Sequence, residues 1–327
     1  MVARGAAPAP TLPTRVLIVQ HDGATEAFKA QPEIVRMLVR QGIISFTGKT
    51  NPREAWRTIV STQEVVGIKV HSAPGPQTGT RPSVVEAVVE GLIAAGIPTN
   101  HIIIWDRQLV DLHRAGFADI ARQHGVRLAG ALDTGWDETM FYDFALLGHL
   151  VYGDLEFEKK GESVGRKSFV SKLLTREITK VINVSPMLNH NAIGVCGNLY
   201  GLALGSVDNT MRFEGDPAKL AQAVPEIYAL PALGDHVALN IVDALVCQYE
   251  GQQIGRLHNS IALNQLRFGT DPVALDVLSV QEILEQRSRG LGATHTNRTD
   301  LYSNAALLEL GTADVRRIDV QTVRIGP

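Results

Sequence analysis

Short apolar runs alternate with amphipathic patterns through the first half of this chain, and no other sequence feature constrains the fold as strongly. Runs rich in β-branched residues, suited to strands buried on both faces, lie at 15–20, 65–71, 101–105, 125–128 and 180–184. Apolar residues at helical spacing lie between them, at 32–41, 53–61, 82–95 and 109–124. Parallel strands need long crossover connections, usually helices, so the alternation predicts an α/β fold with a mainly parallel sheet flanked by helices.

The pattern becomes mixed after Asp208. Helical spacing recurs at 217–228 and 272–286, and strand-like runs lie at 236–242, 245–250, 262–268 and 317–325. Some of these strands are expected to be antiparallel. We therefore predict a mixed C-terminal half within a single α/β domain at 14–327, preceded by a disordered Ala- and Pro-rich leader at 1–13. The least regular stretch, 133–172, is expected to form a lobe or lid.

Composition narrows the class of partner. The 327 residues carry a formal net charge of -3 with interspersed charges, so nucleic-acid binding is not expected. No apolar run approaches the roughly 20 residues of a membrane span. We expect a small-molecule substrate, and the sequence is compatible with a homo-oligomer. A cytoplasmic location is expected, with export after removal of a signal peptide as the alternative.

Cysteine content argues against one group of cofactors. The chain has two cysteines, Cys196 and Cys247, and so cannot supply the four thiolates of a cysteine-ligated iron–sulfur cluster. An iron–sulfur cluster is therefore not expected, and no cofactor is predicted. The histidines show no HExxH spacing. A divalent metal held by His71, His190 and a carboxylate such as Asp208 or Asp243 is an alternative that the spacing does not support.

The segment 181–209 places polar residues in an otherwise glycine-rich and aliphatic stretch. If 191–204 is helical, His190 and four glycines (194, 197, 201 and 205) share one face, which suits close approach of a backbone or a flat ligand. Asn191 and Asn198 flank that face. His190 lies between two asparagines that could fix its tautomer, which makes it a candidate acid–base residue. A glycine-rich loop and a core histidine are the alternatives.

Polar residues also stand where the predicted parallel strands end. Lys69 and His71 end one run, Arg107 follows the next, and Asp243 follows an apolar run in the second half. Ligands of parallel sheets bind outside the carboxyl ends of strands. The Pro- and Gly-rich loop after His71 ends at Arg81 before a helix start, so it could present backbone N–H groups and a guanidinium to a carboxylate or phosphate. For Asp208 and Asp243, turn chemistry is the alternative.

Several motifs in the same order resemble the family known as domain of unknown function 362. They are VGIKV, TRPSVVEAVVEGLIAAGIP with IIIWDR, KVINVSPMLNHNAIGV, NLYGLALGSVDN, ALVCQYEGQ and GTDPVALD. The resemblance implies an α/β protein from a group in which some members carry ferredoxin-like cysteine clusters. This chain has no such cluster, has His71 where asparagine is expected, and has Leu188-Asn189-His190 in place of Lys-Asp-His. A redox role based on such a cluster is therefore not expected here.

These observations lead us to expect an enzyme that uses acid–base chemistry, of isomerase, lyase or cyclase type, on a small anionic or polyoxygenated substrate. Lys69, His71, His190 and Asp243 are the expected catalytic residues. The expected substrate-binding residues are Arg81, Arg107, Asn191, Asn198 and Asp208. A cofactor- or metal-binding protein without chemistry of its own, and a metal-dependent hydrolase, are the alternatives.

Overall fold

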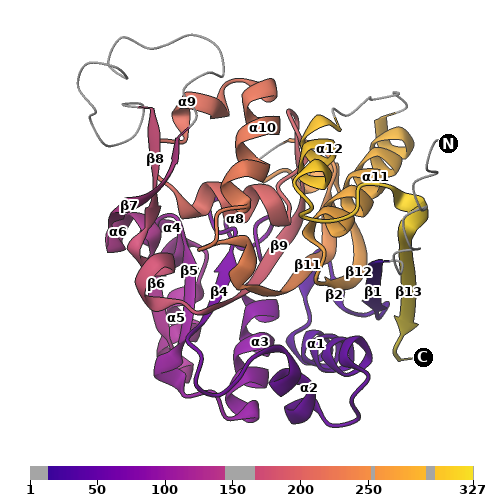
Figure 1. The fold of residues 1–327 in the computed structure, drawn as a ribbon. Helices are drawn as coiled ribbons and strands as arrows, with labels where there is room; N and C mark the ends of the chain where they lie inside the picture. Colours follow the sequence, from indigo (N-terminus) through magenta and orange to yellow (C-terminus); the bar gives the residue numbers. More distant parts are fainter. Residues whose placement is uncertain (1–13, 144–165, 252–254, 292–298, 327) are drawn as a thin grey trace, which may run out of the picture.

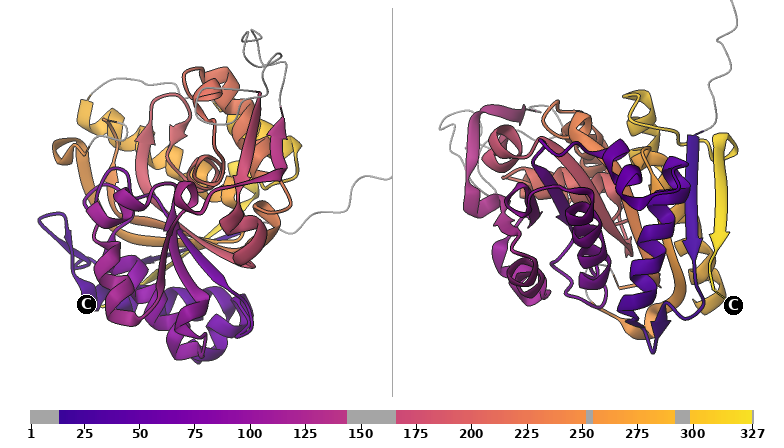
Figure 2. Two further views of the ribbon diagram at one scale, coloured as in Figure 1. Left: turned by 90° about the vertical axis from the view of Figure 1, so that its left-hand side faces the viewer. Right: turned by 90° about the horizontal axis from the view of Figure 1, so that it is seen from below.

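A computed structural model describes residues 14–143, 166–251, 255–291 and 299–326 of the chain. One mixed sheet forms its centre, with helices on both faces (Figures 1 and 2). The order across the sheet is β13 (Ile318–Arg324), β1 (Thr14–Gln20), β12 (Ser260–Gly269), β11 (Val237–Gln248), β9 (Lys180–His190), β4 (Val66–Val70), β5 (Ile102–Asp106) and β6 (Arg127–Gly130), and β10 (Gly194–Val195) pairs with β9.

The pairing directions confirm the predicted fold class. Strands β11, β9, β4, β5 and β6 are parallel to one another, and β12 is antiparallel to both of its neighbours, β11 and β1. Strand β13 pairs with β1 in parallel. Two small antiparallel sheets stand apart from this path, formed by β2 (Thr25–Glu26) with β3 (Lys29–Ala30) and by β7 (Trp136–Asp143) with β8 (Lys167–Ser171).

Two hydrophobic clusters, one on each side of the sheet, hold the layers together. One is packed by α1 (Pro32–Thr47), α2 (Pro52–Ile59), α3 (Pro82–Ala95), α4 (Leu109–Arg114) and α5 (Phe117–His124). The other is packed by α8 (Asn198–Ser206), α9 (Met211–Glu214), α10 (Pro217–Tyr228), α11 (Pro272–Leu291) and α12 (Asp300–Leu307). The short α6 (Ala131–Thr134) follows β6. Apolar residues on both faces of the central strands explain why the sheet is buried by two helical layers.

The predicted helix at 191–204 is wrong in its first half. Strand β9 continues to His190, a turn follows, and β10 pairs back on β9 through Gly194 opposite His190. The helix starts only at Asn198. Turn propensity of the Asn- and Gly-containing segment outweighed the helical spacing. The glycine stripe is thereby reduced to Gly201 and Gly205, and His190 lies on a strand.

Two other boundaries differ from the prediction. The helix expected at 109–124 is two helices, because Gly116 adopts a left-handed φ of 91° between them. The strands expected at 236–242 and 245–250 are one strand, β11, with a bulge between Ala244 and Val246. The predicted leader at 1–13 lies outside the described residues, as does the middle of the predicted lobe, whose flanks are β7 and β8. None of the helices in the described ranges is long and apolar enough to span a membrane.

Candidate functional site

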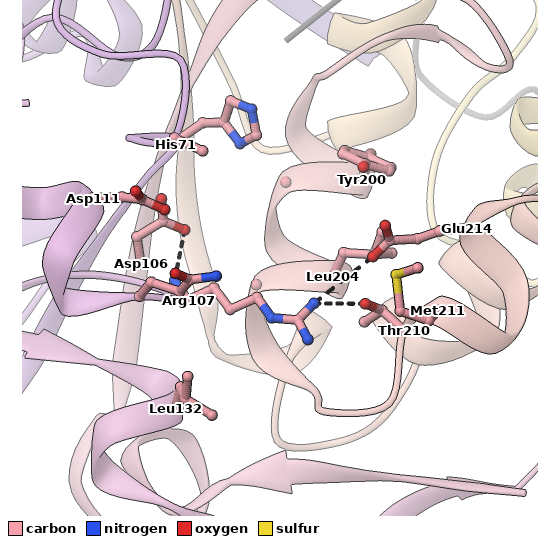
Figure 3. Close-up of a pocket in the computed structure, with 14 residues that line it drawn as sticks. His71, Asp106, Arg107, Asp111, Leu132, Tyr200, Leu204, Thr210, Met211 and Glu214 are labelled. Atoms are coloured by element: carbon pink, nitrogen blue, oxygen red, sulfur yellow. Dashed lines mark hydrogen bonds and ion pairs between the residues drawn. The ribbon is translucent and has the colours of Figure 1, made fainter. Parts of the chain in front are cut away.

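A cavity of about 440 Å³ lies outside the carboxyl ends of β4 and β5, against helix α8. We call it the β4–β5 pocket. This is the edge where ligands of parallel sheets bind. Its lining residues come from the ends of β4 and β5, from α4, α6, α8 and α9, and from the segments between them: His71, Ala73, Asp106, Arg107, Gln108, Asp111, Leu132, Tyr200, Gly201, Leu204, Gly205, Thr210, Met211 and Glu214 (Figure 3).

A buried ion pair supports the pocket wall. Lys69 Nζ lies 2.8 Å from Asp106 Oδ1, and both side chains are less than a tenth exposed, at 1% and 8%. Asp106 Oδ2 accepts hydrogen bonds from the backbone N–H and the hydroxyl of Ser72, at 2.7 and 2.6 Å. Burial acts to raise the pKa of Asp106, but the Lys69 ammonium and these donors hold it below its ordinary value. Asp106 is therefore a carboxylate at neutral pH.

Helix α8 packs directly on this ion pair. A Cβ at position 205 would collide with the end of the Lys69 side chain, so glycine lets the helix approach without displacing the ion-paired lysine. Gly201 is different, because a Cβ there would meet no atom within 4 Å, and the residue lines the pocket. The absence of a side chain at Gly201 leaves the helix surface open to whatever enters the cavity.

His71 follows β4 and contributes its imidazole to the pocket wall (Figure 3). Burial lowers its pKa to about 4, and the nearby Lys69 charge acts in the same direction, while Asp106 opposes the shift. The ring is consequently neutral at pH 7. Its Nε2 is buried and has no hydrogen-bond partner among the described residues. A neutral ring beside a carboxylate can accept a proton, and the Asp106 charge would stabilise the imidazolium that results.

Arg107 extends across the pocket from the end of β5. Its Nη1 donates to Thr210 Oγ1 at 2.6 Å and lies 3.8 Å from Glu214 Oε1, as Figure 3 shows. Asp208, predicted as a binding residue, is buried near enough to act electrostatically on Arg107, but its Oδ1 accepts the Phe169 N–H at 2.6 Å. Thr210 and Glu214 are thus among the groups that orient the Arg107 guanidinium, which places a cation on the pocket wall.

The exposed part of the pocket wall is largely apolar. Leu132 and Met211 line the cavity and are 47% and 57% exposed, which is high for residues of their kind. Leu204 and Tyr200 continue the apolar surface along α8. The polar groups of the pocket, in contrast, gather around Asp106 and Arg107. The cavity therefore has a charged interior and a largely apolar rim, to which the exposed Gln108 adds one amide.

Arg81 and Asp243, both predicted as site residues, form a separate buried pair outside the lining of this pocket. Arg81 Nη1 lies 3.0 Å from Asp243 Oδ1, with side-chain exposures of 4% and 0%. Asp243 Oδ2 accepts the Arg81 backbone N–H at 2.9 Å, and Oδ1 also accepts from Leu245 N–H at 3.3 Å. Asp243 thus anchors the start of α3 to β11.

His190 and Asn191 also lie outside the lining of the β4–β5 pocket. The His190 ring packs on Tyr200 with centroids 4.8 Å apart, and Tyr200 in turn lines the pocket. Burial lowers the pKa of His190 to about 4, and its Nδ1 accepts the Ala192 N–H at 3.3 Å, which leaves the proton on Nε2. Asn191 is exposed and accepts a hydrogen bond from Asn189 at 3.0 Å.

Asn198 belongs to a buried polar network rather than to the pocket wall. Asp276 Oδ1 accepts from the Asn198 backbone N–H at 2.7 Å and from its Nδ2 at 2.9 Å, and Oδ2 accepts from Leu199 N–H at 2.9 Å. Asn198 Oδ1 accepts from Ser185 Oγ at 3.0 Å. Burial raises the pKa of Asp276 to about 7, against the effect of these donors. The network caps helix α8 and fixes it over β9.

Six polar residues of the pocket were not predicted as site residues: Asp106, Gln108, Asp111, Tyr200, Thr210 and Glu214. Asp106 could have been found, because it ends a predicted strand beside Arg107. Thr210 and Glu214 follow a segment without periodic pattern, and nothing in their spacing indicates that Arg107 reaches them.

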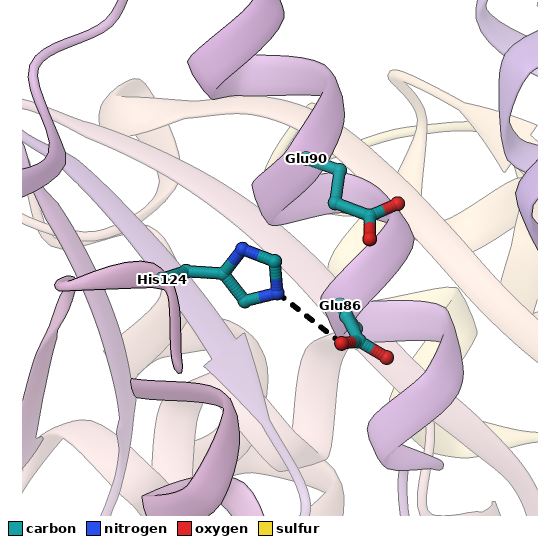
Figure 4. Close-up of side chains that lie close together, drawn as sticks. All are labelled: Glu86, Glu90 and His124. Atoms are coloured by element: carbon teal, nitrogen blue, oxygen red, sulfur yellow. Dashed lines mark hydrogen bonds and ion pairs between the residues drawn. The ribbon is translucent and has the colours of Figure 1, made fainter. Parts of the chain in front are cut away.

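The described residues bring three potential metal ligands together elsewhere, at Glu86 and Glu90 on α3 and His124 on α5 (Figure 4). Glu86 Oε1 lies 3.2 Å from His124 Nε2. Arg36 Nε lies 2.8 Å from Glu90 Oε2 and its Nη2 lies 3.9 Å from Glu86. The Arg36 guanidinium already offsets the charge of the two carboxylates. We therefore interpret this cluster as a set of ion pairs and hydrogen bonds that links α1, α3 and α5.

Comparison with known proteins identifies the family. The sequence profile of the domain of unknown function DUF362 matches residues 66–281, which include β4, β5 and α8, and the chain belongs to this family. The resemblance inferred from its motifs is thereby confirmed. Among solved structures, a Thermotoga maritima protein matches with 11% identity and a TM-score of 0.44 over 80% of this chain and 59% of that one. The chain thus spans less than two thirds of that protein. A search of curated proteins found no match.

Proposed function

We propose that this protein is an acid–base enzyme that acts on a small oxygen-rich organic substrate in the β4–β5 pocket. The observation that carries the proposal is the neutral imidazole of His71 on the pocket wall, whose Nε2 has no partner among the described residues, beside the Asp106 carboxylate. Positioned bases of this kind contribute about 10²- to 10⁴-fold to reaction rates. His71 would take a proton from the substrate. In an isomerase it would return the proton to another atom of the substrate. In a lyase the deprotonated substrate would lose water, and in a cyclase it would close a ring.

The neighbouring charges fit this role. Asp106 stands close enough to favour a protonated His71, and the Lys69 ammonium keeps Asp106 ionised. Arg107 is the cation that would bind a carboxylate or an enolate oxygen, with Thr210 as a further hydrogen-bonding group. The apolar rim at Leu132 and Met211 favours a substrate with an apolar part that extends toward the mouth.

His190 receives a positioning role in this proposal. Its ring contact with Tyr200 places it one layer behind the pocket wall. Replacement of His190 should therefore shift the Tyr200 ring on the pocket wall. We expect this shift to raise KM more than it lowers kcat. This differs from the direct acid–base role that the sequence suggested for it.

Proton exchange with solvent tests the proposal for reactions of these types that begin with removal of a carbon-bound proton, because that carbon can then take up deuterium. The full chain is incubated in D₂O with a panel of C3 to C6 hydroxy- and oxo-carboxylates, and deuterium incorporation is followed by NMR. We expect incorporation into at least one compound, with a loss of about 10²-fold or more in His71→Asn. His258→Asn, at an exposed histidine, is the matched control. Equal rates in the wild type and His71→Asn would contradict the role of His71.

A second candidate is a binding protein that holds a flat organic ligand and performs no chemistry. Gly201 favours it, since this residue leaves the α8 backbone open at the cavity. Native mass spectrometry of the purified protein distinguishes the two functions. A tightly held organic species that returns unchanged after release, together with no proton exchange, would support binding alone.

A further inference from the structure

A second cavity, of about 330 Å³, borders the loop between β4 and α3. Its wall combines the β2–β3 hairpin, the loop residues Pro76 and Gln77, the first residues of α3, and Leu257. We call it the hairpin pocket. None of its lining residues lines the β4–β5 pocket, so the two cavities are separate features of the described structure.

Two polar atoms on residues of this wall have no hydrogen-bond partner among the described residues. They are Arg81 Nε and Ser83 Oγ, and both are covered from bulk solvent. Arg81 as a whole is only 3% exposed. Its two terminal nitrogens are occupied, because Nη1 donates to Asp243 Oδ1 at 3.0 Å and Nη2 donates to Gln77 O at 2.7 Å. Buried donors without partners are uncommon in folded proteins and call for an acceptor.

The start of α3 adds the Ser83 N–H at the same place, whereas Pro82 has no N–H and the N–H groups of Arg81 and Val84 already donate to Asp243 Oδ2 and Arg81 O. This helix has 14 residues, and its N-cap, Arg81, offers no side-chain hydrogen bond to the first turn. Such a helix terminus carries a partial positive charge and favours anions. Lys29 lines the same cavity from the hairpin and is exposed, so its ammonium can move toward a ligand.

The hairpin holds an unusual backbone conformation beside the cavity. Its two-residue turn has Ala27 at a φ of 47° and Phe28 at 64°. Glycine and asparagine normally occupy such positions, because other side chains are strained there. Strain of this kind persists where the surroundings fix it and often marks ligand sites. Phe28 lines the cavity and offers an apolar surface near Lys29.

We infer that the hairpin pocket binds a small oxyanion, a phosphate or carboxylate group, as a site separate from the β4–β5 pocket. The anion would accept from Arg81 Nε and from the hydroxyl and N–H of Ser83, with the Lys29 ammonium moving over it. An apolar body attached to the anion would pack on Phe28 and Leu257. The loop that begins at His71 contributes residues to both cavities. An anion bound in the hairpin pocket could therefore stabilise the loop conformation that positions His71.

Titration of the full chain with inorganic phosphate and, separately, acetate tests the inference at constant ionic strength and pH 7. Backbone amide resonances of Lys29 and Ser83 are followed by NMR. We expect saturable shifts at these two residues with at least one anion. Saturation by phosphate alone identifies a phosphate site, saturation by acetate alone identifies a carboxylate site, and saturation by both supports general oxyanion recognition.

Two variants separate specific binding from general charge effects. Lys29→Glu should weaken binding at least about tenfold, since it replaces an attractive charge by a repulsive one. Lys49→Glu makes the same change at an exposed lysine outside the pocket and should leave binding within about twofold. Ser83→Ala should weaken binding about threefold or more without a reversal of charge.

Three outcomes would overturn the inference. They are the absence of any saturable shift at Ser83, equal weakening by Lys29→Glu and Lys49→Glu, and shifts centred on Arg107 and Thr210 instead. The third outcome would assign the anion to the β4–β5 pocket. Neither the titration nor its variants depends on turnover, so the result does not depend on the proposed enzymatic function.

Discussion

Two buried ion pairs, Lys69–Asp106 and Arg81–Asp243, resemble each other closely in geometry. Their N–O distances are 2.8 and 3.0 Å, and all four side chains are less than a tenth exposed. They differ in surroundings. Asp106 lies on the wall of the β4–β5 pocket between His71 and Arg107, whereas Asp243 is fully buried and its oxygens are occupied by Arg81 and Leu245.

The comparison shows that a charged residue at the end of a strand is a poor guide to function by itself. Both pairs satisfy the same physical requirement, because a buried charge must be paired and hydrogen-bonded. What separates them is the carboxylate: Asp106 borders an open cavity, whereas the Asp243 oxygens are enclosed by Arg81 and backbone, and in the second pair only the cation Arg81 borders a cavity. The following predictions test whether that difference has the consequences we assign to it.

Removal of the carboxylate charge from either buried ion pair should have the largest effect on the free energy of unfolding. Asp243→Asn and Asp106→Asn should each lower the free energy of unfolding by about 3–5 kcal/mol, because each leaves a buried cation without its partner. Urea denaturation at pH 7 measures this loss. Proton exchange per folded molecule should fall in Asp106→Asn and stay at the wild-type level in Asp243→Asn. A parallel fall in both variants would remove the distinction between the two pairs.

The free energy of unfolding should depend on pH because of two histidines at or near the β4–β5 pocket. Burial lowers the pKa of His71 and His190 to about 4, so the unfolded chain binds protons below about pH 6.5 that the folded chain does not. The stabilisation by the neutral rings is thus complete above about pH 6.5 and declines as the pH falls toward 4.

Replacement of either histidine by asparagine should reduce that decline by about 1–3 kcal/mol between pH 7 and pH 4. Urea denaturation across this range measures it. Asp243→Asn serves as a reference. The part of the slope of its free energy of unfolding against pH that comes from the histidines should equal that of the wild type. An unchanged slope in His71→Asn would show that this ring titrates normally in the folded protein.

Substitution of the two α8 glycines by alanine should change the stability of the protein in opposite directions. Gly205→Ala should cost about 1–3 kcal/mol, because its methyl group collides with Lys69. Gly201→Ala should raise stability by up to about 1 kcal/mol through helix propensity, while its methyl group narrows the cavity. Thermal unfolding and proton exchange would be measured together. Similar destabilisation by both changes would contradict the packing of α8 on the ion pair.

The smallest effect is expected at a partly exposed ion pair. Arg36 and Glu90 lie 2.8 Å apart, as close as Lys69 and Asp106, but their side chains are 34% and 33% exposed. Glu90→Gln should therefore change the free energy of unfolding by less than about 1 kcal/mol. A loss comparable with that of Asp243→Asn would show that burial does not set the strength of these pairs.

Much of the fold could be predicted from local pattern. The boundaries of α3 and α10 were predicted correctly, since proline begins each helix and apolar spacing defines its buried face. Asp271 Oδ1 accepts the Ala274 N–H at 2.8 Å and so caps the start of α11 immediately before Pro272, a local arrangement typical of helix starts. Local pattern failed at 191–197, where a hairpin and a helix compete for the same glycines and asparagines.

The site could be predicted only in part, because it depends on contacts distant in sequence. The strand-end positions of His71 and Arg107 placed them at the pocket. The partner of Lys69 is 37 residues away, and that of Arg81 is 162 residues away. Asp276 lies 78 residues from the helix that it caps. Such pairings follow from sheet order, which periodicity does not define.

The most direct test of the account is the protonation state of His71 in the folded protein. Imidazole nitrogen resonances, assigned by comparison with His71→Asn and His190→Asn, would be followed by NMR from pH 8 to pH 4. We predict that His71 stays neutral to about pH 4 and that a substrate from the exchange panel shifts its resonance at pH 7. A His71 that titrates near pH 6.5 and does not respond to any compound that undergoes exchange would contradict the proposed site.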